Sequence, residues 1–254
     1  MTDFTSTPYT STDQVSSTAD ASANFTIGVT HVDIEKAQRS AVTRTYLEMT
    51  VGIIITAVVA WASYAFDLYY KFLAATGVFG FWGLIIAQIA LVIFLSARVM
   101  KMSTAVARTV FYAYAALMGF TLSTIFAVYS YGSIVIALAF SAAFFFALTM
   151  FSLTTKMDVL KLGPILGVAL IVLIVAEVIM LIAGISLNTM VLSGISLIIF
   201  AGFTVYDTRQ TRVILSSFGD NLEMVKRASI YCALDLYLDF INMFIDLLSI
   251  INHD

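Results

Sequence analysis

The segment "YCALDLYLDFINMFIDLLSI", from Tyr231 to Ile250, is apolar enough to lie in a membrane, yet it carries three carboxylates. They are Asp235, Asp239 and Asp246. Moving a carboxylate out of water costs free energy, so in a membrane helix it needs a partner, a cation or a water-filled cavity. The position of this segment therefore decides both the fold and the function.

The whole chain has the composition of an integral membrane protein. Apolar residues make up 61% of its 254 residues and charged residues only 11%, with a mean hydropathy of +0.98. An ordinary soluble domain contains about 25% charged residues. The sequence has no Gly-rich phosphate loop, no Cys/His metal cluster and no basic nucleic-acid patch, so we expect no nucleic-acid partner.

Seven apolar stretches follow residue 44, each close to the roughly 20 residues that a membrane-spanning helix needs. They predict an all-α membrane protein, a seven-transmembrane-helix bundle over residues 45–254, with the lipid bilayer as its surroundings. Residues 1–44 are rich in Ser, Thr, Asp and Ala, which predicts a disordered cytoplasmic tail. The seven stretches are 46–66, 77–97, 109–129, 133–153, 163–184, 187–207 and 229–250, with a short link "GISLN" (184–188) between the fifth and the sixth.

Basic residues predict the orientation of the chain. With seven spans, twelve of the thirteen Lys and Arg residues fall on one side of the membrane, and only Lys71 falls on the other. Positive charge marks the cytoplasmic side, so we expect a cytoplasmic N-terminus and an external C-terminus. If the Asp-rich last segment instead lay on the membrane surface, six spans would remain.

Four polar residues of the last segment share one helical face. At about 100° per residue, Asp235, Asp239, Asn242 and Asp246 fall within a band of about 80°, together with Tyr231 and Ser249. A helix that floats at the interface usually carries Lys or Arg on its polar face, whereas this face is acidic and anionic headgroups would repel it. We therefore expect the stripe to face the interior of the bundle as an ion path.

A further carboxylate, Asp207, ends the sixth stretch, next in the chain to the last one. The two helices are expected to be antiparallel neighbours, which would bring Asp207 near Asp239. Two carboxylates that close cannot both ionise at low cost, so they share a proton or bind a cation, and we expect a pH-sensitive Ca²⁺ site. The alternative for Asp207 is an ion pair with Arg209 or Arg212.

Three other charged residues are candidates for the same site. Glu177 lies deep in the fifth stretch, where it joins the ion path or is a buried neutral acid. Arg98 and Lys101 end the second stretch, where such residues either mark topology or latch onto an acidic neighbour.

Several segments resemble the transmembrane Bax inhibitor motif family in its bacterial branch. "VYDTRQ" (205–210) followed by "ALDLYLDFINMFIDLLSI" (233–250) resembles the most specific part of the family's sequence. "TTKMDVLKLG" (154–163) and "ALMGFTLSTIF" (116–126) resemble its fourth loop and third span. The resemblance covers about residues 45–250.

The resemblance implies a seven-helix bundle with the last helix near the centre, in the bacterial inner membrane. It also implies a stress-related calcium leak that responds to pH, with Ca²⁺ as the transported ion and no required cofactor. Asp207 and Asp239 would be the pH-sensing pair, and Arg98 or Lys101 would latch the closed state. Asp235 and Glu177 stand where relatives often have a small polar residue and an Asn, so these extra carboxylates would alter pH response or ion preference.

Two other functional classes remain as alternatives. Intramembrane aspartyl proteases also pair two aspartates, but their second motif is Gly-x-Gly-Asp, whereas residues 236–239 read Leu-Tyr-Leu-Asp. We therefore expect that the protein is not an enzyme. A non-transporting regulator that binds a membrane protease or a stress-response partner is the second alternative, in which the polar stripe would only join helices.

Overall fold

The computed structural model describes residues 13–183, 189–218 and 221–252, with side chains described from residue 39 onward except at 181 and 189. The predicted link at 184–188 and the predicted external end at residue 254 lie outside these ranges. Two units are distinguished, residues 1–40 and residues 41–254, and the second contains the candidate site.

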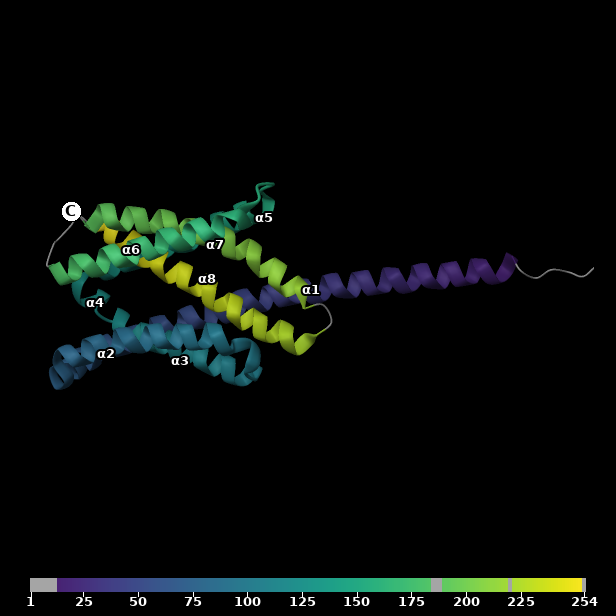
Figure 1. Ribbon diagram of the computed structural model, residues 1–254. Coiled ribbons are helices and arrows are strands. Elements are labelled where there is room, and N and C mark those ends of the chain that lie inside the picture. Colours follow the sequence, from purple (N-terminus) through teal and green to yellow (C-terminus); the bar gives the residue numbers. More distant parts are fainter. Residues whose placement is uncertain (1–12, 184–188, 219–220, 253–254) are drawn as a thin grey trace, which may run out of the picture. The chain divides into compact units, whose positions relative to one another are not determined.

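Most of the described residues are helical and none of them forms a strand, which confirms the all-α prediction (Figure 1). The seven long helices are α1 (Asp13–Ala65), α2 (Leu68–Arg98), α3 (Thr104–Leu122), α5 (Tyr131–Thr154), α6 (Gly163–Ala183), α7 (Thr189–Ser217) and α8 (Leu222–Ile251). Shorter helical turns are η1 (Val99–Lys101), α4 (Ile125–Val128) and η2 (Val159–Leu162).

The boundary between the tail and the membrane domain differs from the predicted one at residue 44. Helix α1 continues through this position, and the second unit begins at Ala41. Ala41 and Thr45 are buried, and Ala41 packs in a cluster with Leu215 of α7 and Ala228 of α8. Small side chains on this face of α1 let the other two helices approach, so four residues assigned to the tail belong to the bundle.

Six helical segments are long and apolar enough to cross a membrane, and they correspond to the first six predicted spans. Helix α8, which carries Asp235, Asp239 and Asp246, is not among them. Its crossing of the membrane stays a prediction. The six segments are Arg39–Ala65, Leu68–Lys101, Thr104–Val128, Tyr131–Thr154, Val159–Met180 and Met190–Ser217.

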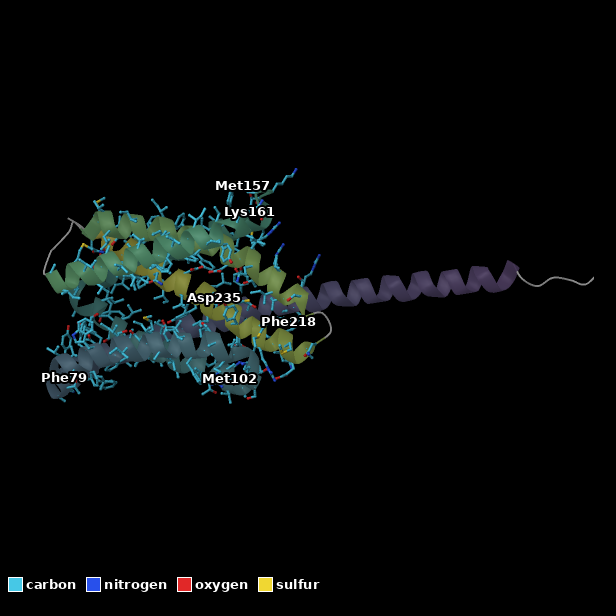
Figure 2. The ribbon with its side chains drawn as sticks, viewed as in Figure 1. Phe79, Met102, Met157, Lys161, Phe218 and Asp235 are labelled. Atoms are coloured by element: carbon cyan, nitrogen blue, oxygen red, sulfur yellow. The ribbon has the colours of Figure 1, made fainter. Side chains whose placement is uncertain are left out.

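Helix α8 lies at the centre of the bundle, as the family resemblance implies. It packs against α7, α5 and α3, and in Figure 1 it passes between the group formed by α6 and α7 and the group formed by α2 and α3. Leu234, Leu236 and Met243 are fully buried. Figure 2 shows Asp235 midway between the end marked by Phe79 and the end marked by Phe218. A helix with this many carboxylates is therefore enclosed by protein rather than by lipid.

A polar contact fixes α8 against α1 and α3. The hydroxyl oxygens of Tyr237 and Thr56 are 2.6 Å apart, and Thr56 Oγ1 also lies 2.9 Å from the carbonyl oxygen of Ala115. A Cβ atom at Gly119 would lie 2.4 Å from the carbonyl oxygen of Thr56, so only glycine allows this helix crossing. Close backbone approach at small residues is the usual basis of helix association in membranes.

Candidate ion site

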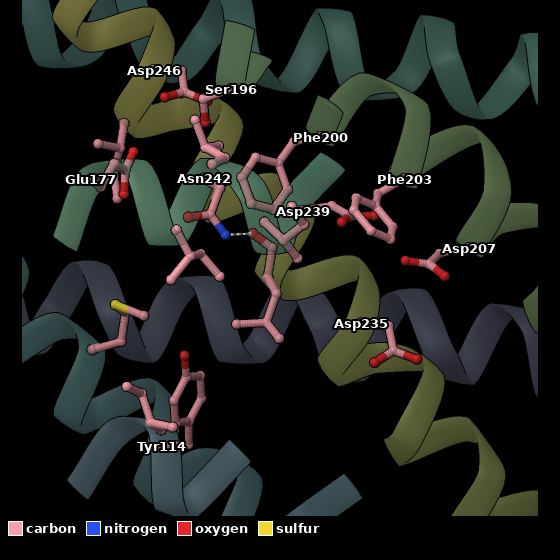
Figure 3. Close-up of a pocket in the computed structure, with 17 residues that line it drawn as sticks. Tyr114, Glu177, Ser196, Phe200, Phe203, Asp207, Asp235, Asp239, Asn242 and Asp246 are labelled. Atoms are coloured by element: carbon pink, nitrogen blue, oxygen red, sulfur yellow. Dashed lines mark hydrogen bonds between the residues drawn. The ribbon is translucent and has the colours of Figure 1, made fainter. Parts of the chain in front are cut away.

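A cavity of about 590 Å³ lies inside the bundle, between α3, α6, α7 and α8 (Figure 3). One water molecule occupies about 30 Å³ in the liquid, so the cavity has room for many. Six polar residues named from the sequence line it: Asp207, Asp235, Asp239, Asn242, Asp246 and Glu177. The structure thus brings together in one place residues that come from three different helices.

Helical periodicity positions the four residues that α8 contributes. Asp235, Asp239, Asn242 and Asp246 follow one another at intervals of three or four residues, so they lie on one face. That face lines the cavity, and the apolar faces of α8 pack against its neighbours. The polar stripe therefore faces the interior of the bundle and not an interface.

Asp207 of α7 and Asp239 of α8 meet in this cavity. Both residues line the cavity, and Figure 3 shows them on its wall from the two neighbouring helices. Two carboxyl groups in one cavity repel each other when both are ionised, so a proton or a cation between them would be favourable. Within the described part of the chain, Asp207 forms no ion pair with Arg209 or Arg212, so the alternative ion pair is not formed.

The remaining α8 residues have local partners. Tyr231 precedes Asp235 by one turn of α8. Ser196 of α7 lies beside Asp246 in Figure 3. The amide nitrogen of Asn242 donates to the carbonyl oxygen of Leu238 at 2.7 Å, the dashed line in Figure 3. This hydrogen bond fixes the Asn242 side chain along the wall of the cavity.

Two carboxyl oxygens in the cavity wall lack partners within the described chain. Asp239 is 3% exposed and Asp246 is 8% exposed, yet Oδ2 of each has no hydrogen-bond partner there. An unsatisfied buried polar group costs about 1–3 kcal/mol, and more when charged. Water or a cation in the cavity would supply what the protein does not.

The carboxylates do not form a closed metal centre. Among the residues described, no group of three or more His, Cys, Asp or Glu side chains is arranged to hold a metal ion. Ca²⁺ takes six to eight oxygen ligands in proteins, so Asp207 and Asp239 would need water to complete a coordination shell. Binding of Ca²⁺ by this pair stays a prediction.

Glu177 lies on α6 and lines the same cavity, but its side chain is exposed rather than buried. Of the two roles expected for it, the structure therefore favours a position along the path over a buried neutral acid. Its neighbours on α6 are apolar, and the helix turns this one carboxylate toward Asp246 and Ser196 (Figure 3).

The two latch candidates lie away from the carboxylates. Arg98 ends α2 and Lys101 ends η1, and both side chains are exposed. Neither lines the cavity, and neither forms an ion pair with the described acidic side chains. Their position at a helix end fits the topology role, and the structure does not bring them to Asp207 or Asp239.

Sequence reasoning missed a second polar group, at the start of α3. Glu48 of α1 is 6% exposed, and the guanidinium of Arg108 binds it through two nitrogens while the Tyr112 hydroxyl donates to it at 2.7 Å. In the sequence, this pairing is indicated only by the acidic Glu48 at the start of the first span and the basic Arg108 at the start of the third. Their pairing depends on which helices are neighbours, which periodicity does not reveal.

The chain has relatives of known sequence along nearly all of the membrane domain. Residues 38–254 match the family model described as "Inhibitor of apoptosis-promoting Bax1". The inner membrane protein YbhL of Escherichia coli K12 is 39% identical over 207 residues, which are 80% of this chain and 86% of YbhL. A protein of Deinococcus radiodurans is 37% identical over 214 residues, 84% of this chain and 90% of that protein. The chain is therefore an integral membrane protein of the Bax inhibitor-1 family.

Proposed function

We propose that the protein is a pH-sensitive calcium leak channel, in which passive Ca²⁺ flux is gated by the pair Asp207 and Asp239. One observation carries the proposal: the cavity gathers five carboxyl groups and one amide, and no Lys, Arg or His among the described residues lines it. Acidic groups without basic partners inside a membrane bundle favour cations and exclude anions.

Oxygen chemistry supports calcium as the ion. Ca²⁺ prefers carboxylate, carbonyl and water oxygens, and its coordination is flexible. The cavity wall offers carboxylate and amide oxygens, and its volume leaves room for the waters that a partly hydrated ion keeps. Weak, incomplete coordination also suits passage, because an ion held in a closed cage leaves slowly.

The paired aspartates support a response to pH. Protons and Ca²⁺ compete for the same oxygens, so uptake of a proton by the pair removes charge from the cavity. The two residues come from α7 and α8, the helices with the most extensive mutual contact. A change in their charge therefore acts on the packing of the central helix, which is the kind of element that a gate requires.

The α8 stripe supplies the length of the path. From Asp235 to Asp246 it covers eleven residues, about 16 Å of helix. This is about half of the roughly 30 Å hydrocarbon thickness. With a cytoplasmic N-terminus in the bacterial inner membrane, the stripe would line the external half and Asp207 would control the internal end.

Calcium flux measured on the purified protein tests the function. Vesicles that contain the protein and an internal calcium indicator should fill with Ca²⁺ faster than empty vesicles. Vesicles with the Asp207→Asn/Asp239→Asn double variant at equal protein content are the matched control. If vesicles with the native protein and empty vesicles fill with Ca²⁺ at the same rate, the leak hypothesis is wrong and the non-transporting regulator is favoured. Cleavage of a membrane peptide by the native protein would indicate a protease.

A further inference from the structure

A second cavity, of about 540 Å³, lies where α1, α3 and α8 meet, at the end of the bundle that Met102 and Phe218 mark in Figure 2. It is separate from the ion site and shares no lining residue with it. Three basic and two acidic side chains line it. Its lining is Arg44, Leu47, Glu48, Val51, Thr104, Ala105, Arg108, Tyr112, Glu223 and Lys226.

Both acidic side chains already have partners. Glu48 accepts hydrogen bonds from Arg108 and from Tyr112. Glu223 accepts a hydrogen bond from the Thr104 hydroxyl at 2.7 Å and lies 3.7 Å from a guanidinium nitrogen of Arg227, which is outside the lining. The Thr104 hydrogen bond, with help from the nearby basic groups, holds the pKa of Glu223 below its ordinary value. Neither carboxylate needs a further cation.

The positive charge in the cavity is in excess. Arg44 is half-buried and forms no ion pair with any described acidic residue. Lys226 has only a long contact, 4.0 Å, to Glu223, which Arg227 also neutralises. The positive charges of Arg44 and Lys226 are therefore not fully neutralised by the described acidic residues. An anion placed between them would gain two charge-assisted contacts.

One wall of the cavity is apolar and exposed, and it lies in a segment long and apolar enough to cross a membrane. Leu47 and Val51 lie one turn apart on α1, and their side chains are 61% and 38% exposed. Arg44 precedes Leu47 by three residues, so the cation and the two apolar side chains lie on one side of α1. A ligand here would meet a cationic pocket and, directly beside it, the region of the acyl chains.

We propose that this cavity binds the headgroup of an anionic phospholipid, with its phosphate between Arg44 and Lys226 and its acyl chains along Leu47 and Val51. Basic pockets between membrane helices on the cytoplasmic side are typical sites for anionic headgroups. The amphipathic shape of the pocket selects a lipid over a soluble anion, because a free phosphate would leave the apolar wall unused. The site is independent of the calcium pathway.

Binding of phosphatidylglycerol to the purified full chain in detergent tests the proposal, measured by native mass spectrometry across a lipid titration. We expect retained phosphatidylglycerol at concentrations where phosphatidylcholine is not retained. Arg44→Gln and Lys226→Gln should each lower the association constant about five-fold, the equivalent of about 1 kcal/mol per basic residue near an anionic lipid. Inorganic phosphate should not displace the lipid at equal concentration.

Lys156→Gln is the matched control, because Lys156 is exposed and lines neither cavity. It should leave binding unchanged, and the melting temperatures of all three variants without lipid should equal that of the native protein. If Arg44→Gln lowers the melting temperature, Lys226→Gln decides the result. Equal binding of both lipids, equal loss with Lys156→Gln, or displacement by inorganic phosphate would each overturn the proposal.

Discussion

At the scale of single residues, the distinctive feature is a carboxyl oxygen that is buried without a partner, at both Asp239 and Asp246. A side chain that only joins helices would be expected to have its hydrogen bonds completed by the neighbouring helix. Asp246 has Ser196 beside it but keeps Oδ2 unpartnered within the described residues. This arrangement suits a group that works with water or an ion.

Asp246→Ala separates a path residue from a structural one. Among the described residues, one of its carboxyl oxygens is buried without a hydrogen-bond partner. We therefore expect the melting temperature in detergent to fall by little, the equivalent of about 1 kcal/mol or less. Calcium flux or cation selectivity should fall, because one of the carboxylates along the path is lost. Both quantities are measured on the same preparation.

Asp158→Ala is the control for that experiment, since Asp158 is exposed, lies outside the cavity and, among the described residues, forms an ion pair only with Lys161. It should leave flux unchanged. An Asp246→Ala protein that unfolds early, yet conducts normally while folded, would argue for a structural stripe and against a path along it.

At the scale of helices, the ion pair between Glu48 of α1 and Arg108 of α3 should contribute to stability. Glu48 is buried, so Arg108→Ala leaves a buried carboxylate with Tyr112 alone. Loss of one partner of a fully buried pair costs about 3–5 kcal/mol, and the partial exposure of Arg108 reduces this to about 1–3 kcal/mol. The free energy of unfolding in mixed micelles measures it.

Lys161→Ala provides the comparison, because it removes an ion pair with Asp158 in which both side chains are exposed. Exposed pairs contribute about 0–1 kcal/mol, so this variant should unfold almost as the native protein does. Equal losses of stability in the two variants would mean that the Glu48 pair is no more than a surface contact.

Periodicity along one helix predicted more of the site than did charges at helix ends. The spacing from Asp235 to Asp246 predicted one polar face on α8, and the order of the chain predicted Asp207 beside it. Arg98 and Lys101 show the limit, since a basic residue at a helix end can turn outward as easily as inward. The contact between Glu48 and Arg108 required knowing that α1 and α3 are neighbours.

At the scale of the whole molecule, α8 is the helix that its neighbours enclose, although it is not one of the six candidate membrane spans. Its neighbours α5 and α7 present apolar side chains outward, such as Phe146, Val191 and Ile198, and α8 inside them needs no lipid-like surface. Hydropathy identifies helices whose surface contacts lipid. It is therefore a poor guide to whether a helix enclosed by other helices crosses the membrane. The number of crossings therefore needs a direct test.

Cysteine labelling of the intact bacterial membrane gives that test. Ser216 is an exposed residue near the end of α7. In a Cys232→Ser background, Ser216→Cys should react only after the cytoplasmic side is made accessible. A cysteine at position 254 should react from outside, because seven crossings put the C-terminus opposite to the basic loops. Reaction of both positions from the same side would mean that the chain crosses the membrane six times and that α8 does not cross it.

The measurement that tests the central claim most directly is the pH profile of calcium flux in native, Asp207→Asn and Asp239→Asn proteins. Flux by the native protein should change across roughly pH 5–8, the range in which a close carboxyl pair exchanges its shared proton. Each Asn variant removes one titrating group and should flatten the profile, whereas Asp158→Ala should retain it. A profile that is the same in all four proteins would contradict the paired-aspartate gate.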